Sequence, residues 1–497
     1  TEFQQFSSPE ILCQPIDDLV LQMKAMGIHN VLQFPFPTPP DRLAVQNALV
    51  TLVNLGAVSS GEDEAITALG RALVKFPVAA RFAKMLLLAQ RLDLIEYTIA
   101  IVAGLSGHSP FIHAVERREK AKAVDEDEDE GKPKEEVEEM EKEWREAEEM
   151  RKHAQWLDQE SDVLSLLRAA GAYAYTGGSS QFCQANHLHE KTMQNMLKLR
   201  QQLTRIVNKL YPETEGFTAI ELSPKMPPPD QETQQILRQI VAAGFLDQVA
   251  KRAPPGTITE GTKIERNCAF IAATGTVKEP VYIHPHSSVF TPNPTKLPQF
   301  VVYQHIMRTS RAYMKMVTAV EPEWLAAIGR NTPLCKYAPP LAEPSPFYQS
   351  ELDEVQCYAK AQYGVHQWTL PAGRIAYPDQ DATEAKDGLA GKYRWFAKFL
   401  LDGQVVAGLL PFAETLKEPS HLLIRKKFDK KIQLLVAKLQ KSGVASRRAL
   451  VAKWREPEGK LFLKTELQAW IQDSQQAAFS RAWSGVVATA VKQEQRR

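Results

Sequence analysis

The sequence predicts a multidomain chain, mainly α plus β, with a winged helix, a helical domain, a small β-barrel and an α+β domain in that order. Its 497 residues are enough for about three or four domains of about 150 residues each. Apolar residues recur at helical spacing through most of the first half, and short β-like runs separated by turn residues come after it. The composition, 44% hydrophobic and 24% charged, is that of a globular protein and excludes a wholly disordered chain.

Residues 1–75 have the pattern of a winged helix. Apolar spacing predicts helices over 19–26, 40–55 and 66–73, with a turn or hairpin over 57–64. Gly27 and Gly56 end the first two helices, and the Pro-rich segment 34–40 excludes helix because proline disfavours the α region in the residue before it. Three helices and a hairpin in so short a stretch indicate a winged helix.

Residues 76–212 are predicted to form a helical domain with a charged insertion at about 116–160. Helices are expected over 79–92, 94–103, 161–175 and 189–210. The insertion holds 19 acidic and 10 basic residues, including six consecutive acids from Asp125 to Glu130. Six like charges together stay solvated, so a surface insertion is expected, with an acidic docking site as the alternative.

The helix expected over 189–210 has an apolar stripe on one side and a basic, amide-rich stripe on another. The basic stripe consists of Lys191, Gln194, Lys198, Gln202, Arg205 and Lys209. Such a face can follow a phosphate backbone, and a merely solvated helix surface has the same pattern. The spacing alone leaves both interpretations open.

Residues 229–338 are predicted to form a small barrel that closes near Trp324. A helix is expected over 233–250, followed by strands over 268–273, 280–283, 300–307 and 313–320. Arg308 and Arg311 fall in the turn between the last two strands, close to Tyr303 and Tyr313. Small barrels hold single-stranded nucleic acid with aromatic rings beside cations, although any exposed turn can carry arginine.

Residues 339–497 are predicted to form an α+β domain that begins with a linker over 339–346. Strands are expected over 367–370 and 374–377, and helices over 392–401, 427–440, 446–454 and 464–471. The stretch 425–460 holds 12 basic residues and 3 acidic ones, the strongest positive block of the chain. On charge alone this block suits RNA and an acidic protein segment equally well.

The net charge of +1 hides this segregation, because the acidic insertion cancels basic stretches elsewhere. Five cysteines in so long a chain give no disulfide framework and favour a reducing compartment. No secretory signal is apparent, and no apolar run approaches the ~20 residues that cross a bilayer, so no membrane partner is expected. The sequence starts at Thr1 rather than Met, and we expect a piece of a longer protein.

The nearest approach to a nucleotide-binding loop is the segment from Gly256 to Lys263. Walker A requires lysine directly after its second glycine, and Thr262 occupies that position. A strand-like run rather than a helix is also expected after the segment. We therefore expect no catalytic residues and no nucleotide hydrolysis by this chain alone.

Two histidine-containing segments are incomplete as metal sites. Cys183, His187 and His189 have no evident fourth ligand nearby, and structural zinc normally takes four. His284 and His286 could share one face of a strand, but a third ligand is missing. No metal is therefore expected.

Several motifs resemble the C-terminal half of DEAH-box RNA helicases. They are, in the winged helix, 8–11, 21–27, 34–40, 65–71 and 76–77; in the ratchet domain, 182–188 and 199–203; and in the OB-fold, 283–288, 300–303, 309–314 and Trp324. The stretches 343–348, 393–405 and 452–454 are similar to the extra C-terminal domain of one nucleolar branch. That branch remodels the small-subunit processome by separating a box C/D snoRNA from pre-ribosomal RNA.

The resemblance implies that the helical domain is a ratchet bundle, that the barrel is an OB-fold and that the RecA motor domains are absent. It implies that this chain is the accessory region of an ATP-dependent RNA helicase. This region would grip single-stranded RNA while the RecA domains of the parent protein unwind a snoRNA/pre-rRNA duplex in the nucleolus. ATP and magnesium would serve the parent helicase, and no cofactor is expected in this chain. The alternative is a protein-docking platform for a processome activator or scaffold subunit, with little RNA affinity.

Two sets of residues are predicted to make these contacts. The RNA-binding set is Asn186, Lys191, Lys198, Arg200, Gln202, Ser287, Ser288, Arg308, Thr309 and Arg311. The partner-binding set is Arg425, Lys426, Lys427, Lys430, Lys431, Arg447 and Arg448. Some of the first set are also expected to stabilise the fold, Arg200 and Gln202 especially, by binding neighbouring helices.

Overall fold

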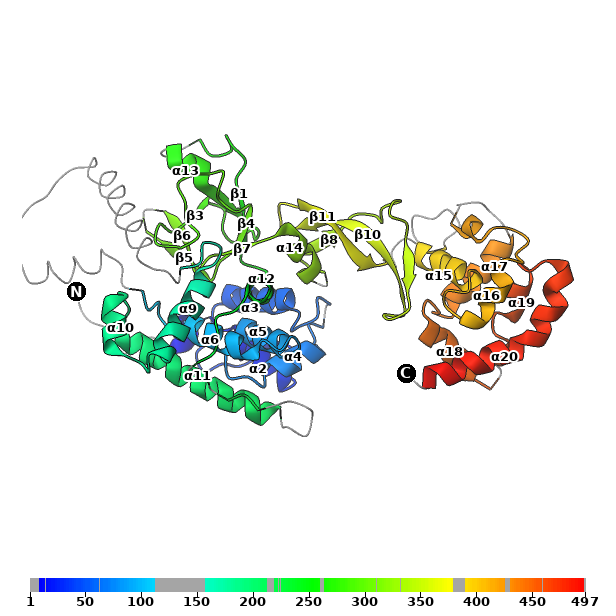
Figure 1. Cartoon of the computed structure of the whole chain (residues 1–497), viewed down its shortest axis with the longest axis horizontal. Helices are drawn as coiled ribbons and strands as arrows, with labels where there is room; N and C mark the ends of the chain where they lie inside the picture. Colours follow the sequence, from blue (N-terminus) through cyan, green and yellow to red (C-terminus); the bar gives the residue numbers. More distant parts are fainter. Residues whose placement is uncertain are drawn as a thin grey trace, which may run out of the picture. The chain divides into compact units, whose positions relative to one another are not determined.

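The computed structural model describes residues 9–495 except for 14, 62, 112–156, 212–218, 222, 224, 260–262, 310, 331, 379–388, 425–429 and 458. Most of the predicted insertion at about 116–160 therefore lies outside the described residues, as do Arg425, Lys426 and Lys427. The chain forms two compact units (Figure 1). The first comprises Thr1–Lys336 and Tyr363–Leu370, and the second comprises Tyr337–Gln362 and Pro371–Arg497.

The N-terminal part of the first unit has the helices expected of a winged helix. They are α1 (Glu10–Cys13), α2 (Asp17–Ala25), η1 (Val31–Gln33), α3 (Arg42–Leu55) and α4 (Ala68–Leu73). Gly56, with φ +77°, ends α3, and the Thr67 hydroxyl accepts a hydrogen bond from Gly70 N to cap α4. The wing is short: Val58 and Ile66 form an antiparallel bridge, and Ser59 N and Thr67 N donate to Ala65 O and Ala57 O on either side of it.

The helical domain follows with α5 (Ala80–Gln90), α6 (Ile95–Leu105), α9 (Asp162–Tyr175), α10 (Ser180–Ala185) and α11 (Glu190–Leu210). Helix α6 packs on both α9 and α11. Its approach to α9 requires Gly104, because a Cβ there would lie 2.5 Å from Leu166 Cδ2. The N-terminus of α5 is capped by another helix, since Ala80 N donates to the Asp18 carboxylate of α2 at 2.8 Å.

The barrel contains a seven-stranded sheet in the order β5-β6-β3-β2-β1-β4-β7, in which the β3–β6 pairing is parallel. Its strands are β1 (Val249–Arg252), β2 (Ala269–Ala272), β3 (Val281–Ile283), β4 (Phe300–Val302), β5 (His305–Arg308), β6 (Ala312–Lys315) and β7 (Thr318–Val320). Helix α12 (Gln231–Gly244) precedes the sheet, α13 (Lys263–Cys268) lies between β1 and β2, and α14 (Pro322–Ile328) follows.

Four details of the barrel differ from the prediction. The helix expected to reach residue 250 ends at Gly244, and β1 occupies its last positions. The run 300–307 is two strands, because Tyr303 N donates to Gln248 O whereas Gln304 N donates to Lys315 O. The run 313–320 is broken at Met316, whose φ is +53°. A six-residue helix, α13, rather than a strand, follows the glycine-containing segment.

The chain continues with a four-stranded sheet and a helical cluster. The strands are β8 (Cys335–Tyr337), β9 (Phe347–Gln349), β10 (Glu354–Tyr363) and β11 (Trp368–Ala376), ordered β11-β10-β8 with β9 on β10. The helices are α15 (Gly391–Leu401), η4 (Ala407–Leu409), α16 (Leu410–Ala413), η5 (Ser420–Leu423), α17 (Lys430–Lys441), α18 (Arg447–Arg455), η6 (Gly459–Leu461), α19 (Lys464–Gln468), η7 (Asp473–Gln475) and α20 (Gln476–Gln495). The strands expected over 367–370 and 374–377 are one strand, β11.

The helical cluster has its own aromatic core. Trp454, Trp470, Phe396 and Phe479 are fully buried in it, and the Trp454 and Trp483 rings meet edge to face at 5.7 Å. Helix α20, which the sequence reading did not predict, contributes Phe479 and Trp483 to this core. The C-terminal half of the second unit is therefore α-helical, and its β content comes from the sheet that precedes it.

Candidate nucleic-acid interface

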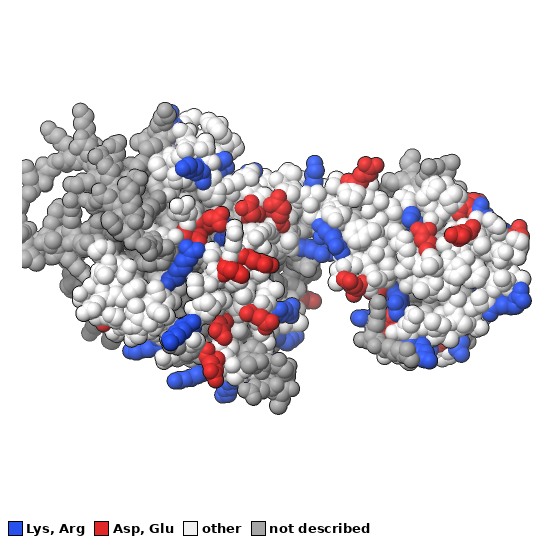
Figure 2. Space-filling view, in the orientation of Figure 1, with Lys and Arg blue, Asp and Glu red and all other residues white. Residues whose placement is uncertain are grey.

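The basic stripe predicted on α11 lies on the exposed side of that helix. Lys191, Gln194, Lys198, Gln202, Arg205 and Lys209 are all exposed. The opposite side of α11 buries Met193, Met196 and Leu203. Lys and Arg side chains recur along the course of α11 in the face shown in Figure 2. The helix thus presents a solvent-accessible row of cations and amides over about five turns, since its 21 residues rise about 1.5 Å each.

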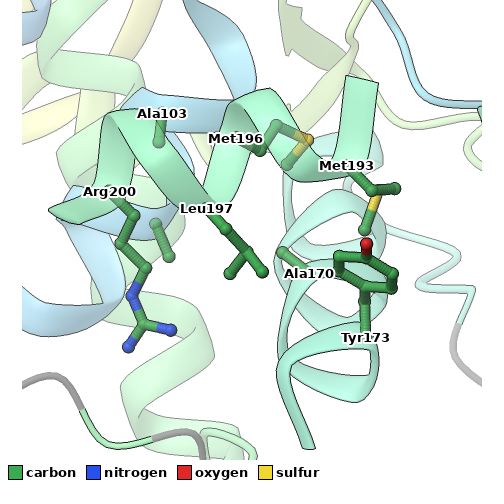
Figure 3. A pocket seen from close by; sticks show the side chains of 8 residues that line it. Ala103, Ala170, Tyr173, Met193, Met196, Leu197 and Arg200 are labelled. Carbon is green, nitrogen blue, oxygen red and sulfur yellow. The ribbon is translucent and has the colours of Figure 1, made fainter. Parts of the chain in front are cut away.

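Arg200 differs from this stripe because it is only 7% exposed. It lies at one end of a small apolar pocket whose walls come from α6, α9 and α11, with Tyr173 at the other end (Figure 3). Burial lowers the pKa of Arg200 below its ordinary value, with the nearby Glu96 opposing that shift. One of its nitrogens lies 3.9 Å from Met226 Sδ. Arg200 therefore packs within the helical domain.

Asn186 lies at the C-terminal end of α10, where the chain turns into α11. Its amide donates to Phe182 O at 2.9 Å, a contact that closes the last turn of the short helix. His187 follows with φ +53°, and Leu188 pairs with Phe111 in an isolated bridge. Asn186 is therefore part of the α10–α11 corner.

Ser287 and Ser288 bind a buried carboxylate at the start of α9. Asp162 accepts hydrogen bonds from the Ser287 hydroxyl (2.8 and 2.9 Å), the Ser288 hydroxyl (2.8 Å) and Ser288 N (2.7 Å). Val317 N also donates to it at 2.8 Å. Burial raises the pKa of Asp162, and these hydrogen bonds act in the opposite direction. The two serines thus join the barrel to the helical domain.

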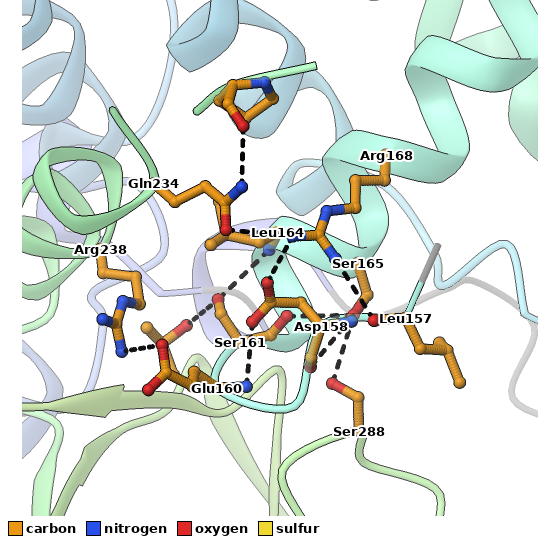
Figure 4. Close-up of polar contacts among 12 residues, drawn as sticks. Leu157, Asp158, Glu160, Ser161, Leu164, Ser165, Arg168, Gln234, Arg238 and Ser288 are labelled. Carbon is orange, nitrogen blue, oxygen red and sulfur yellow. Dashed lines mark hydrogen bonds and ion pairs between the residues drawn. The ribbon is translucent and has the colours of Figure 1, made fainter. Parts of the chain in front are cut away.

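A second set of polar contacts surrounds this junction (Figure 4). Arg168 forms an ion pair with Asp158 at 2.8 Å and donates to Gln234 of α12 at 3.0 Å. Arg238 of α12 pairs with Glu160 at 3.0 Å and stacks over the Trp324 ring at 5.1 Å. The start of α9 is therefore held by the barrel strands and by α12 together.

The turn between β5 and β6 carries the other predicted cations. Arg308 is exposed and pairs with Glu279 at 2.8 Å, and Thr309 is exposed beside it. The Arg311 guanidinium lies 5.8 Å from the Tyr282 ring centroid, and the Tyr282 and Tyr313 rings are 6.3 Å apart. The turn thus combines exposed cationic and hydroxyl groups with nearby aromatic rings.

One short segment contacts the start of α11 and the residue that precedes β5. Gln304, which precedes β5, donates to Leu105 O at 2.7 Å, and His189 N, at the start of α11, donates to Pro110 O at 2.8 Å. Pro110 is five positions after Leu105, so their Cα atoms are at most about 18 Å apart. The first turn of α11 therefore lies near the start of β5, at the end of that strand away from Arg308.

Some of the predicted partner-binding residues form ion pairs within the second unit. Lys431 pairs with Glu418 at 3.4 Å, and Arg447 pairs with Glu494 at 3.0 Å and is only 13% exposed. Lys430 is exposed, and the Arg448 side chain is 83% exposed although its Nε lies 3.7 Å from Glu494 Oε1. Of the described members of the set, Lys430 and Arg448 are the ones that extend into solvent.

Within the described residues, no group of three or more His, Cys, Asp or Glu side chains could hold a metal ion. Cys183 is buried between Tyr173 and the α10–α11 corner, and burial raises its pKa. No helix among the described residues has the length and apolar character needed to cross a membrane.

The residue that sequence reasoning missed is Asp162. Ser161, the residue before it, caps α9 by accepting a hydrogen bond from Leu164 N at 3.2 Å. The partners of Asp162 lie 125 to 155 residues away. Its one local signal is an acid directly after a capping serine.

Four domain families match the chain in the order of the observed domains. They are the helicase-associated winged helix (48–78), the ratchet-like helicase-associated domain (79–166), the oligonucleotide/oligosaccharide-binding fold (237–332) and the C-terminal domain of the DEAH helicase DHX37 (409–487). The predicted fold class is confirmed by these matches. The predicted domain boundaries, 1–75, 76–212, 229–338 and 339–497, stay predictions.

Curated relatives match along most of this chain. It is 33% identical to the human probable ATP-dependent RNA helicase DHX37 and 31% identical to the Drosophila melanogaster probable helicase kurz, over 97% of its length in both cases. It is 34% identical to the yeast probable helicase DHR1 over 68% of its length. The chain spans about 40% of the first two relatives and 29% of the third.

The fold and the matches define the accessory domains of an RNA helicase: a winged helix, a ratchet, an OB-fold and a further C-terminal domain. The chain belongs to the DEAH-box RNA helicase family, and its last domain is of the DHX37 type. The resemblance seen in the sequence is thereby confirmed.

Proposed function

We propose that this chain is the RNA-gripping accessory region of an ATP-dependent RNA helicase that acts in small-subunit ribosome maturation in the nucleolus. RecA domains of the parent protein, with ATP and magnesium, would unwind a snoRNA/pre-rRNA duplex while these domains hold the single strand. The observation that carries the proposal is the pair of exposed basic surfaces, the α11 stripe and the β5–β6 turn.

The chemistry of these surfaces suits single-stranded RNA. Lys191, Lys198, Arg205 and Arg308 can neutralise phosphates, and Gln202 and Thr309 can donate hydrogen bonds to the backbone. Tyr313, which is half-buried, and Arg311 place a ring and a cation at the barrel turn, and the buried Tyr282 packs beneath them. The buried positions of Arg200 and Ser287 give these two residues a supporting role within the same proposal.

The test is a salt titration of RNA binding by fluorescence anisotropy with a labelled oligouridylate. Neutralising one phosphate on a single strand contributes about 0.7 to the slope of log K against log salt, so replacing both Arg308 and Arg311 by alanine should lower the slope by up to about 1.4. The control is Arg481→Ala with Lys492→Ala, which removes the same charge from exposed positions of α20. An unchanged slope in the Arg308/Arg311 variant would contradict the proposal.

A second candidate function is a docking platform for a processome activator or scaffold protein. It is favoured by the exposed Lys430 and Arg448 on a domain of DHX37 type. Under this alternative the chain would bind a processome protein tightly and would show no affinity for single-stranded RNA. Replacing Lys430 and Arg448 by glutamate should then abolish the protein contact.

A further inference from the structure

The turn of the β10–β11 hairpin lies in a stretch, 333–408, that none of the four domain matches covers. Its tip belongs to the first unit and packs on the barrel. Val365 N donates to Ala273 O at 3.0 Å, and the Tyr363 hydroxyl donates to Leu246 O at 2.5 Å. The hairpin thus adds new side chains to the surface of the OB-fold.

The backbone of the turn is fixed by a close approach to the barrel. Gly364 has φ +67°, and a Cβ there would lie 2.6 Å from Ala273 O. Gln367 also has a positive φ, +49°, which a residue with a side chain rarely adopts. Strained turns persist where surrounding contacts hold them and often serve a site, so the side chains between these two residues are the ones to consider.

His366, between these two residues, and Trp368, directly after Gln367, form a ring platform. The His366 and Trp368 rings are stacked, with centroids 5.6 Å apart and planes 19° apart, and His366 is exposed. Lys251 Nζ of β1 lies 5.9 Å from the Trp368 centroid and 5.4 Å from that of Phe300. Val365, beside the stack, is 62% exposed. An exposed ring backed by a second ring and a cation is the arrangement on which bases of single-stranded nucleic acid stack.

One loop of the barrel links the platform to the β5–β6 turn. The loop between β2 and β3 starts at Ala273, beneath the hairpin tip, and reaches Glu279, which pairs with Arg308. Six residues span at most about 21 Å. Lys278, within this loop, is exposed. A strand held at Arg308 could therefore pass along the loop to the hairpin.

We propose that the hairpin tip is a base-stacking extension of the single-strand surface of the barrel, with His366 and Trp368 as the platform and Lys278 as a phosphate contact between the two. This inference rests on the proposed RNA-gripping function. The occupant is single-stranded nucleic acid, because stacked rings recognise the π-face that every base has, and the adjacent cations suit its phosphates.

The test measures binding of a labelled 12-nucleotide oligouridylate by the whole chain at several salt concentrations. His366→Ala should weaken binding about fivefold or more, the lower end of the range for one stacked base, without changing the salt slope. His366→Phe should restore the affinity, and Lys278→Ala should lower the slope by up to about 0.7. His421→Ala, an exposed histidine of the second unit, is the matched control.

Trp368→Leu provides a second variant, and thermal melting followed by circular dichroism confirms that each variant is folded. If His366→Ala and Trp368→Leu bind RNA within twofold of the parent chain, the hairpin does not contact RNA, and this inference is wrong while the proposed function stands. If the parent chain itself does not bind the oligonucleotide, the proposed function fails, and the inference fails with it.

Discussion

Asp162 is expected to be the carboxylate that holds the barrel to the helical domain, and replacing it by alanine tests this role. The variant leaves two backbone N–H groups, those of Ser288 and Val317, without their acceptor. The serine hydroxyls can rotate to other partners, whereas the two amides cannot. Each buried amide left without an acceptor costs about 1–3 kcal/mol, so the gross loss is about 2–6 kcal/mol.

Part of this loss is offset. Burial raises the pKa of Asp162, which means that the fold already disfavours the charged carboxylate, and removing it recovers that cost. We therefore expect a net loss of about 2–4 kcal/mol. Asp162→Asn should not rescue the junction, because each carboxylate oxygen accepts from one backbone N–H. Either orientation of the amide would place its NH2 group against a donor.

Amide hydrogen exchange read by mass spectrometry is the suitable assay, because a chain of several domains need not unfold in one step. Peptides covering 284–289 and 316–319 should exchange about 30-fold faster or more in Asp162→Ala, as about 2 kcal/mol of local opening free energy implies. Asp41→Ala is the control, since Asp41 is an exposed cap that accepts from Leu43 N alone. Exchange within twofold of the parent chain in both peptides would refute the reasoning.

Three further predictions concern other parts of the chain. Burial lowers the pKa of Lys84 to about 8, so the stability due to this group is complete above the unfolded pKa of ~10.5 and is lost as pH falls through 8. Lys84→Met should therefore stabilise the chain by about 3 kcal/mol at pH 7. A melting temperature that does not rise at pH 7, or that rises equally at pH 10.5, would count against this prediction. Replacing Lys198 and Arg205 by alanine should lower the salt slope of RNA binding by up to about 1.4, because each cation can neutralise one phosphate. The melting temperature should not change, because both side chains are exposed. An unchanged slope would show that α11 is not part of the RNA interface. The Asp353 carboxylate caps α18 by accepting hydrogen bonds from the backbone N–H groups of Arg447 and Arg448. Asp353→Ala should therefore speed amide exchange in the first turn of α18 by an amount equivalent to about 1–2 kcal/mol. Exchange at the parent rate would show that this cap is dispensable.

Helices were predictable where local signals decide them. The helix predicted over 161–175 begins at Ser161, which caps α9, and the two faces of α11 follow from residue spacing. Gly56 ends α3 in the left-handed conformation that glycine adopts most readily. In these elements the residues that define the structure are neighbours in the sequence.

Strand boundaries were less predictable, because distant partners set them. The break at Tyr303 depends on hydrogen bonds to Gln248 and Lys315. The predicted strands 367–370 and 374–377 are one strand, β11, which accommodates Pro371 because it is an edge strand, where proline costs no ladder hydrogen bond on the solvent side. The role of Asp162 was not predicted for the same reason, since its hydrogen-bond partners come close to it only in the folded chain.

The candidate interface was predictable in part. The exposure of the α11 stripe and of Arg308 follows from amphipathic spacing and from a turn position. Arg200 lies four residues after Met196 and three before Leu203, so helical spacing places it on the buried side of α11, whereas Gln202 lies on the exposed side. The hairpin platform is non-local, since His366 and Trp368 reach the barrel only through the close approach of Gly364 to Ala273.

The most direct test of the RNA-gripping proposal is a crosslinking map with an oligouridylate that contains 4-thiouridine, read by mass spectrometry on the whole chain. We predict crosslinked peptides from α11 and from the β5–β6 turn on the same oligonucleotide, with yields that fall as salt rises. Crosslinks confined to the second unit, or none at all, would contradict the proposal that these two surfaces hold a single strand.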